Sequence, residues 1–238
     1  NMLPIYRLSE GKNNLEKNTE TFDAVNNMLS KKQVILIFSE GLSENNWDLR
    51  NLKKGPPRIA LRAWTSNQQD QNTVVLPVGI TYQHYQGANK SAILNYGNYL
   101  NKEEFTYQAN MSSYVTDFNN KIAKQFDKLA YINPTLHENT IQHNSFMAEW
   151  QQSEAKNMDV LAQLKTTNWV NKNAALKQPL NAKYFLLIWL WPHYKFMQFI
   201  TAKATNGNVF YDSILFGLTL LLSPLYVLSL ILIVFYII

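Results

Sequence analysis

Short continuous apolar runs dominate the first hundred residues of this chain, and amphipathic helical patterns dominate the remainder. The runs predict strands at residues 3–6, 34–38, 73–80 and 92–96. The run at 34–38 is apolar throughout, as expected of a strand that is covered on both faces.

Helical spacing of apolar residues lies between these runs. It predicts one helix over about 18–31 and a second that opens at Gly55-Pro56-Pro57, where proline suits the first turn. Strand, helix, strand, helix, strand in this order predicts an α/β fold. We expect a mainly parallel sheet with crossover helices over residues 1–100.

Residues 101–178 change to a helical character. Val115, Phe118, Ile122, Phe126 and Leu129 recur at spacings of three and four, and a long polar helix is expected from about 136 to 164. Neither stretch carries a catalytic spacing. We interpret this part as a helical cover or spacer.

Residues 179–238 form an expected membrane-associated region. The apolar stretch 184–191 is too short to span a bilayer and predicts an interfacial or re-entrant piece, with Trp189, Trp191 and Tyr194 at headgroup level. Residues 214–238 contain no charge and predict a transmembrane helix, which Pro224 would kink. A buried core helix is the less favoured alternative.

Lysines set the expected orientation. Lys183, Lys195 and Lys203 precede the apolar run, so the positive-inside rule places the α/β domain in the cytoplasm. The chain opens inside a structured pattern and stops inside the apolar run. We expect both ends to be cut.

Overall charge narrows the possible partners only a little. The net charge is +5 and the pI about 9.2, but the basic residues are scattered rather than clustered. Nucleic-acid binding is therefore disfavoured. The chain has no cysteine, which excludes disulfides, Cys-ligated zinc and thiol nucleophiles.

Charged residues at the ends of the predicted strands are the candidates for chemistry. Glu40 ends the 34–38 run beside Gly41, where a carboxylate could bind a hydroxyl while glycine lets backbone approach closely. Arg7 follows the first run, and Lys53 and Arg58 flank a helix start that favours anions. A plain turn and solvated surface charges are the alternatives.

Other residues carry weaker signals. Pro77 cannot donate to a sheet ladder, so we interpret its role as architectural. The four histidines, His84, His137, His143 and His193, show no metal spacing, and none has an aspartate five positions on. No metal site is expected.

Three segments together resemble the glycerolipid acyltransferase superfamily, in particular bacterial 1-acylglycerol-3-phosphate acyltransferases. They are residues 3–7 (LPIYR), 38–41 (FSEG) and 76–79 (LPVG), and the likeness covers about residues 3–97. It implies that Arg7 contacts the substrate phosphate and that Phe38, Glu40 and Gly41 shape the glycerol-phosphate site. The resemblance also implies that Pro77, Val78 and Gly79 either line the acyl side of the site or have a structural role.

The same resemblance implies a general base that this sequence does not contain. In the family a His-x-x-x-x-Asp block precedes these segments, and it would lie upstream of Asn1. Two departures also bear on the acceptor. Ser39 replaces the usual proline, and residues 42–44 (LSE) stand where many members have Thr-Arg-Ser. Arg7, with Lys53 or Arg58, would have to compensate for the missing arginine.

The expected function is a membrane-attached O-acyltransferase of phospholipid biosynthesis, in the bacterial inner membrane and inactive as this stretch alone. It would use acyl-CoA or acyl carrier protein as co-substrate and a lysophospholipid or glycerol phosphate as acceptor, with no further cofactor. One alternative is a non-catalytic lipid-binding or scaffold protein with this fold. Another is a membrane-anchored α/β domain in which the motifs occur by chance.

Overall fold

A computed structural model describes residues 2–6, 16–66, 73–87, 90–105, 110–137, 140–167, 190–206 and 209–237. The chain divides into two compact units. The first comprises residues 1–42, 48–80 and 94–132, and the second comprises 43–47, 81–93 and 133–238. Each unit is described below by itself.

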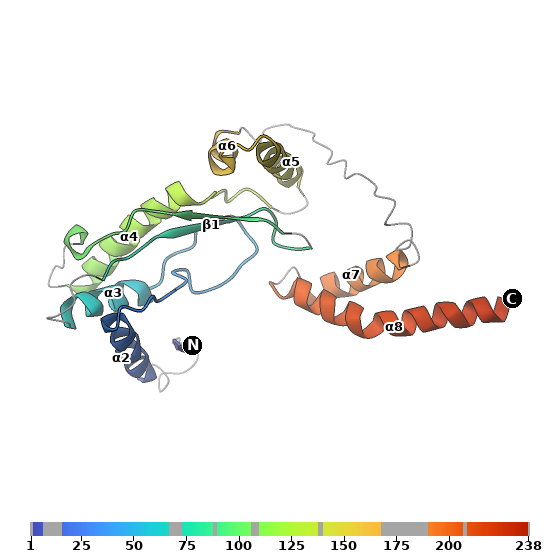
Figure 1. The fold of residues 1–238 in the computed structure, drawn as a ribbon, viewed down its shortest axis with the longest axis horizontal. Helices are drawn as coiled ribbons and strands as arrows, with labels where there is room; N and C mark the ends of the chain where they lie inside the picture. The colour runs from blue at the N-terminus through green and yellow to red at the C-terminus, as the bar shows by residue number, and fades with distance from the viewer. Residues whose placement is uncertain are drawn as a thin grey trace. The chain divides into compact units, whose positions relative to one another are not determined.

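Three helices and the start of a hairpin build the first unit. The helices are α2 (Lys17–Ser30), α3 (Gly55–Ser66) and α4 (Met111–Leu129), and Figure 1 shows α3 next to both α2 and α4. Two of them lie where the sequence predicts helices, at about 18–31 and from residue 55. Asn110 caps α4 by accepting a hydrogen bond from the Ser112 backbone N–H at 2.9 Å.

The core of the first unit lies between α3, α4 and the segment 100–105. Its buried members are Ala60, Leu61, Trp64, Leu100, Phe105, Tyr114, Val115, Phe118 and Ile122. Stacked rings hold the segment against both helices, because Phe105 lies 5.4 Å from Trp64 and 4.8 Å from Phe118 between ring centroids. The apolar spacing at Val115, Phe118, Ile122 and Phe126 therefore predicts the packed face of α4 correctly.

The predicted parallel sheet is wrong. The described residues form one two-stranded antiparallel sheet of β1 (Val78–Tyr82) and β2 (Ala92–Tyr96). Hydrogen bonds from Gly97 N to Pro77 O (2.9 Å) and from Gln83 N to Ser91 O (3.0 Å) flank it. Because a short loop joins these strands, each pairs with its neighbour along the chain, and no crossover helix is used.

The predicted strands at 3–6 and 34–38 are also absent from that sheet. Residues 33–38 have no regular secondary structure, and Val34, Leu36 and Phe38 are 92%, 79% and 70% exposed. A continuous apolar run specifies burial but not the partner strand that would provide it. Within the described residues no strand lies beside this run, so the expected two-sided burial does not occur.

One face of the hairpin packs on the end of α4. A Cβ at Gly79 would lie 2.5 Å from the backbone C and O of Leu129, and the Asn95 side-chain amide donates to the same carbonyl oxygen at 2.9 Å. The backbone of β1 and the end of α4 therefore approach too closely for any side chain at residue 79.

The second unit holds an aromatic core and two pairs of helices. Trp47 donates its indole N–H to the Tyr82 carbonyl oxygen at 2.8 Å, and its ring lies 5.6 Å from that of Phe146. The helix α5 (Ile141–Ala155) pairs with α6 (Val160–Thr166), and Trp150 and Leu164 are fully buried there. The single long helix predicted over 136–164 is thus wrong, because Asn157 takes a positive φ of 51° and breaks it.

The last two helices are α7 (Trp191–Thr205) and α8 (Tyr211–Ile237). Figure 1 shows them side by side, α7 in orange and α8 in red. Residues 211–233 of α8 are long and apolar enough to cross a membrane, and only 6% of its most apolar window is buried. The structure thus places a candidate span where the sequence predicts one, with Pro224 inside the helix as expected. The apolar stretch 184–189 lies outside the described residues.

Candidate functional site

The turn at residues 38–41 brings three of the predicted site residues together. Gly41 N donates to Phe38 O at 3.2 Å and closes the turn, and Gly41 takes a φ of +67°, a conformation that favours glycine. The chain then returns alongside, since Lys53 N donates to Ser39 O at 2.8 Å. Glu40 and Gly41 thereby lie next to the segment that leads into α3.

Glu40 faces the backbone of this returning segment. Its carboxylate accepts a hydrogen bond from Arg50 N at 3.4 Å, which is at the long limit for such a bond. Glu40 is half-buried at the turn.

Lys53 covers Gly41. A Cβ at residue 41 would lie 3.0 Å from Lys53 Cγ and 3.7 Å from Cε, so the aliphatic stem of the lysine lies along the glycine. The side chain of Lys53 is exposed overall. Its ammonium group thus stands near the turn with access to solvent, as an anion-binding group would.

The start of α3 contributes charge through side chains more than through its backbone. Pro56 and Pro57 occupy early positions of the helix and have no N–H, so two of the donors that usually bind an anion there are missing. The first turn holds no acidic residue. Lys53, Lys54 and Arg58, all exposed, therefore supply most of the positive potential at this helix end.

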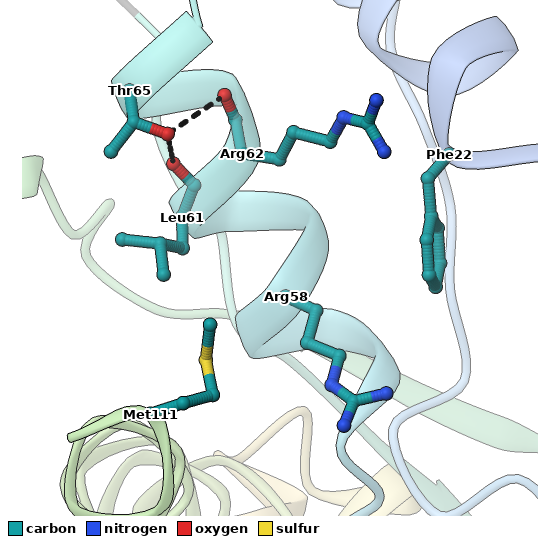
Figure 2. Close-up of a pocket in the computed structure, with 6 residues that line it drawn as sticks. All are labelled: Phe22, Arg58, Leu61, Arg62, Thr65 and Met111. Atoms are coloured by element: carbon teal, nitrogen blue, oxygen red, sulfur yellow. Dashed lines mark hydrogen bonds between the residues drawn. The ribbon is translucent and has the colours of Figure 1, made fainter. Parts of the chain in front are cut away.

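A pocket of about 510 Å³ lies beside α3 in the first unit. Its lining residues come from α2, α3 and α4: Phe22, Arg58, Leu61, Arg62, Thr65 and Met111. Figure 2 shows the two arginine side chains, one helical turn apart, extending toward Phe22. The pocket combines cationic groups with apolar walls, which suits a ligand with an anionic head and an apolar part.

Existing contacts limit what the pocket can offer. Arg62 forms an ion pair with Asp23 of α2, and the Thr65 hydroxyl donates to the Leu61 carbonyl oxygen at 2.8 Å (Figure 2). Within the described part of the chain, Arg58 has no such carboxylate partner. Arg58 is consequently the pocket's best candidate for binding an incoming anion.

Of the remaining predicted site residues that the structure describes, Phe38 belongs to the turn and the others do not. Arg7 falls outside the described residues. Phe38 begins the turn with its ring in solvent, whereas Pro77, Val78 and Gly79 lie at the start of β1 beside the end of α4. The close contact with Leu129 explains why a glycine is needed at residue 79. A role of Gly79 on the acyl side stays a prediction.

No histidine belongs to the first unit. His84, His137, His143 and His193 all fall in the second unit, while the turn at 38–41 belongs to the first. Among the described residues no three acidic or histidine side chains gather as a metal site would require. The turn and the pocket thus offer groups that can bind a ligand.

Of the six pocket residues, the sequence analysis singled out only Arg58 as part of a site. The available signal was the spacing of Arg58 and Arg62, which puts both on one face of a helix. The opposite wall depends on how α2 and α4 pack, which no local pattern specifies.

No family model matches the chain, and neither a curated protein nor a solved structure is significantly similar to it. A functional assignment therefore depends on the residues and geometry described above.

Proposed function

We propose that this protein is a membrane-attached O-acyltransferase that transfers a fatty acyl group to a lysophospholipid or glycerol phosphate. Acyl-CoA or acyl carrier protein would supply the acyl group. The observation that carries the proposal is the convergence of Glu40, Gly41 and Lys53 at the turn before α3. Glu40 and Gly41 come from the segment 38–41, which the resemblance links to the glycerol-phosphate site, and Lys53 is one of the cations expected to compensate for the missing arginine.

Each group has a role that follows from its chemistry. The Glu40 carboxylate accepts a hydrogen bond from a glycerol hydroxyl, and Gly41 leaves room for that part of the substrate. Lys53 and Arg58 attract the phosphate, as two exposed cations near one helix end. Among the described residues no strand ends at Glu40, so the proposed glycerol-phosphate site depends on the turn at 38–41 and not on the edge of a sheet.

Membrane attachment fits a reaction whose acceptor and product are lipids. Helix α8 provides a candidate span, and Lys195 and Lys203 precede it. By the positive-inside rule, the preceding part of the protein would face the cytoplasm, at the inner membrane if the source is bacterial. These features support the proposed location without depending on the turn.

Binding of the acceptor tests the proposed site directly. Lysophosphatidate in mixed detergent micelles should bind the full chain, and Lys53→Gln or Arg58→Gln should each weaken binding by about tenfold, because a charge-assisted contact contributes roughly 1.5–3 kcal/mol. Lys124→Gln removes the same charge from the exposed side of α4 and should bind normally. Equal affinity in all three variants would exclude the turn and α3 as the phosphate site.

A second pair of variants tests the carboxylate. Glu40→Gln keeps the shape of the side chain but weakens acceptance from a hydroxyl, so acceptor affinity should fall while affinity for inorganic phosphate does not. Glu103→Gln, at an exposed position in the short 3-10 helix η2 (Lys102–Glu104), is the matched control. A parallel loss of phosphate affinity in Glu40→Gln would indicate a general disturbance of the turn.

A non-catalytic lipid-binding protein is the second candidate function. It is favoured by the pocket lined by Arg58, Phe22 and Met111, which combines a cationic group with apolar walls and would bind an amphipathic lipid without reacting with it. Sequencing the coding region upstream of Asn1 separates the two functions. A His-x-x-x-x-Asp block there supports the enzyme, and an in-frame start without it supports lipid binding alone.

A further inference from the structure

Helix α7 packs on α8 through one stripe of side chains. His193, Met197 and Thr201 recur every four residues and are 8%, 3% and 0% exposed. The His193 ring stacks on that of Tyr226, with centroids 4.8 Å apart and planes at 19°. This contact and the short connection between the helices make them an antiparallel hairpin (Figure 1).

Because that stripe faces α8, the opposite face of α7 points away from the hairpin. It carries Trp191, Phe196 and Phe199, which are 61%, 58% and 66% exposed. Leaving such rings in water forfeits roughly 25 cal/mol for each Å² of apolar surface, which makes the face costly unless something covers it. A long helix of a water-soluble protein would normally turn these rings inward.

The charges on α7 indicate what covers this face. Lys195 and Lys203 are exposed on the same side, and the sequence of α7 contains no acidic residue. Lys195 Nζ lies 5.9 Å from the centre of the Trp191 ring, so the ammonium group and the aromatic ring lie next to each other on this face of α7. Aromatic rings with lysines between them are typical of helices at a membrane interface.

The partner helix provides an independent observation. Phe216, Leu220 and Leu225 of α8 are 69%, 63% and 63% exposed, and almost none of its apolar window is covered by protein. A helix of this composition requires lipid around it. Because α7 is packed on α8, any bilayer that surrounds α8 reaches α7 as well.

An ion pair holds the first turn of α8 in a polar setting. Asp212 accepts a hydrogen bond from Gly87 N at 2.8 Å and pairs with Lys90. The charged start of α8 is thereby attached to the loop after β1, within the second unit. This contact keeps the start of α8 among hydrated polar groups at the membrane surface.

We propose that the outward face of α7, defined by Trp191, Lys195, Phe196, Phe199 and Lys203, is a lipid-contacting surface for a bilayer with anionic headgroups. The aromatic rings enter the interface, and the two lysines bind the headgroup phosphates. The α7–α8 hairpin then associates with the membrane as one body. This surface is independent of the proposed acyltransferase site in the first unit.

Site-specific fluorescence tests the proposal cleanly because the chain has no cysteine of its own. Single variants Phe199→Cys and Phe196→Cys in the full chain would carry an environment-sensitive dye, in vesicles of phosphatidylcholine with phosphatidylglycerol. Brominated lipid chains should quench both dyes by at least about half of the quenching at Phe216→Cys on α8. Lys156→Cys, at an exposed position after α5, supplies the water-exposed reference.

The outcomes separate a lipid surface from other occupants. If the α7 dyes are quenched no more than the dye at residue 156 while residue 216 is quenched, lipid does not contact this face and the proposal fails. If quenching rises only when unlabelled protein dilutes the labelled chain, a second copy covers the face, which also overturns it. In vesicles without phosphatidylglycerol quenching should fall, and Lys195→Gln with Lys203→Gln should remove that difference.

Discussion

The aliphatic stem of Lys53 lies along Gly41, so closely that a Cβ at residue 41 would be 3.0 Å from Lys53 Cγ. The two residues are twelve positions apart, and the hydrogen bond from Lys53 N to Ser39 O brings their segments together. Their contact couples the conformation of the turn to the position of a cation.

Gly41→Ala should disturb the turn through its backbone as well as through Lys53. A positive φ of 67° costs an L-residue about 1 kcal/mol or more, so the free energy of unfolding should fall by at least that amount. Affinity for lysophosphatidate should fall with it. Chemical denaturation and the micelle binding assay measure the two effects.

Gly55→Ala is the matched control for this change. The Cβ would lie 3.9 Å from Ile37 Cδ1, an ordinary contact, and the residue begins α3 without a positive φ. Alanine there should leave stability unchanged or raise it slightly. A loss as large as that of Gly41→Ala would contradict the assignment of strain to residue 41.

Gly79→Ala should be the more damaging of two substitutions beside Leu129. Its Cβ would meet backbone atoms at 2.5 Å, which cannot move away by changing a rotamer, and we expect a loss of about 1–3 kcal/mol in unfolding free energy. At Gly97 the nearest atom is the end of the Leu129 side chain at 2.8 Å, which can rotate. Gly97→Ala should cost less, and the reverse order in thermal unfolding would refute this account.

Stability should fall at high pH through Tyr114. Burial, with a smaller contribution from the Asp117 charge, raises the pKa of its phenol above the ordinary value of 10. Above pH 10 the unfolded chain therefore releases this proton first, so the folded state loses stability as pH rises. Unfolding measured between neutral pH and the alkaline range should show this slope.

Tyr114→Phe isolates that effect. The variant keeps the ring in the core of the first unit but has no proton to lose, so the decline above pH 10 should be shallower than in the unchanged chain. Tyr96→Phe, at an exposed residue, is the control. Equal alkaline slopes in all three proteins would contradict the assignment to Tyr114.

Trp47→Phe tests the core of the second unit. The substitution removes the hydrogen bond to the Tyr82 carbonyl oxygen and shortens a ring that is only 3% exposed, so we expect a loss of about 2–3 kcal/mol. Trp191→Phe, on an exposed ring, should change stability in detergent by less than about 0.5 kcal/mol. Near-ultraviolet circular dichroism during unfolding distinguishes the two.

Local patterns predicted the helices well where a cap and an apolar stripe coincide. The Gly55-Pro56-Pro57 start of α3 and the stripe from Val115 to Phe126 are examples, because both signals lie within one element. The break at Asn157 escaped prediction, although asparagine adopts a positive φ more readily than most residues, because asparagines are common throughout this polar stretch.

Strand pairing could not be predicted in the same way. The runs at 34–38 and 73–80 are both apolar and β-branched, yet one has no strand beside it and the other forms a hairpin with its neighbour, within the part of the chain that the structure describes. Which segments pair is decided by loop closure and by the surfaces available to cover them, and neither is encoded within the run.

The candidate site, too, could be predicted only in part from local sequence patterns. The motif at 38–41 singled out Gly41, whose positive φ makes the turn possible, but it did not predict the approach of Lys53. The wall that Phe22 and Met111 build around Arg58 required the packing of three helices, which lies beyond the reach of local sequence patterns.

The exposed side chains of Val34, Leu36 and Phe38 have a practical consequence for handling the protein. They recur at every second residue of an extended segment, so one edge of the chain offers both an apolar stripe and backbone groups outside any sheet. Segments of this kind template the growth of cross-β aggregates. In buffer without detergent the chain will self-associate through residues 33–38, and a lysine in place of Leu36 will slow fibril formation.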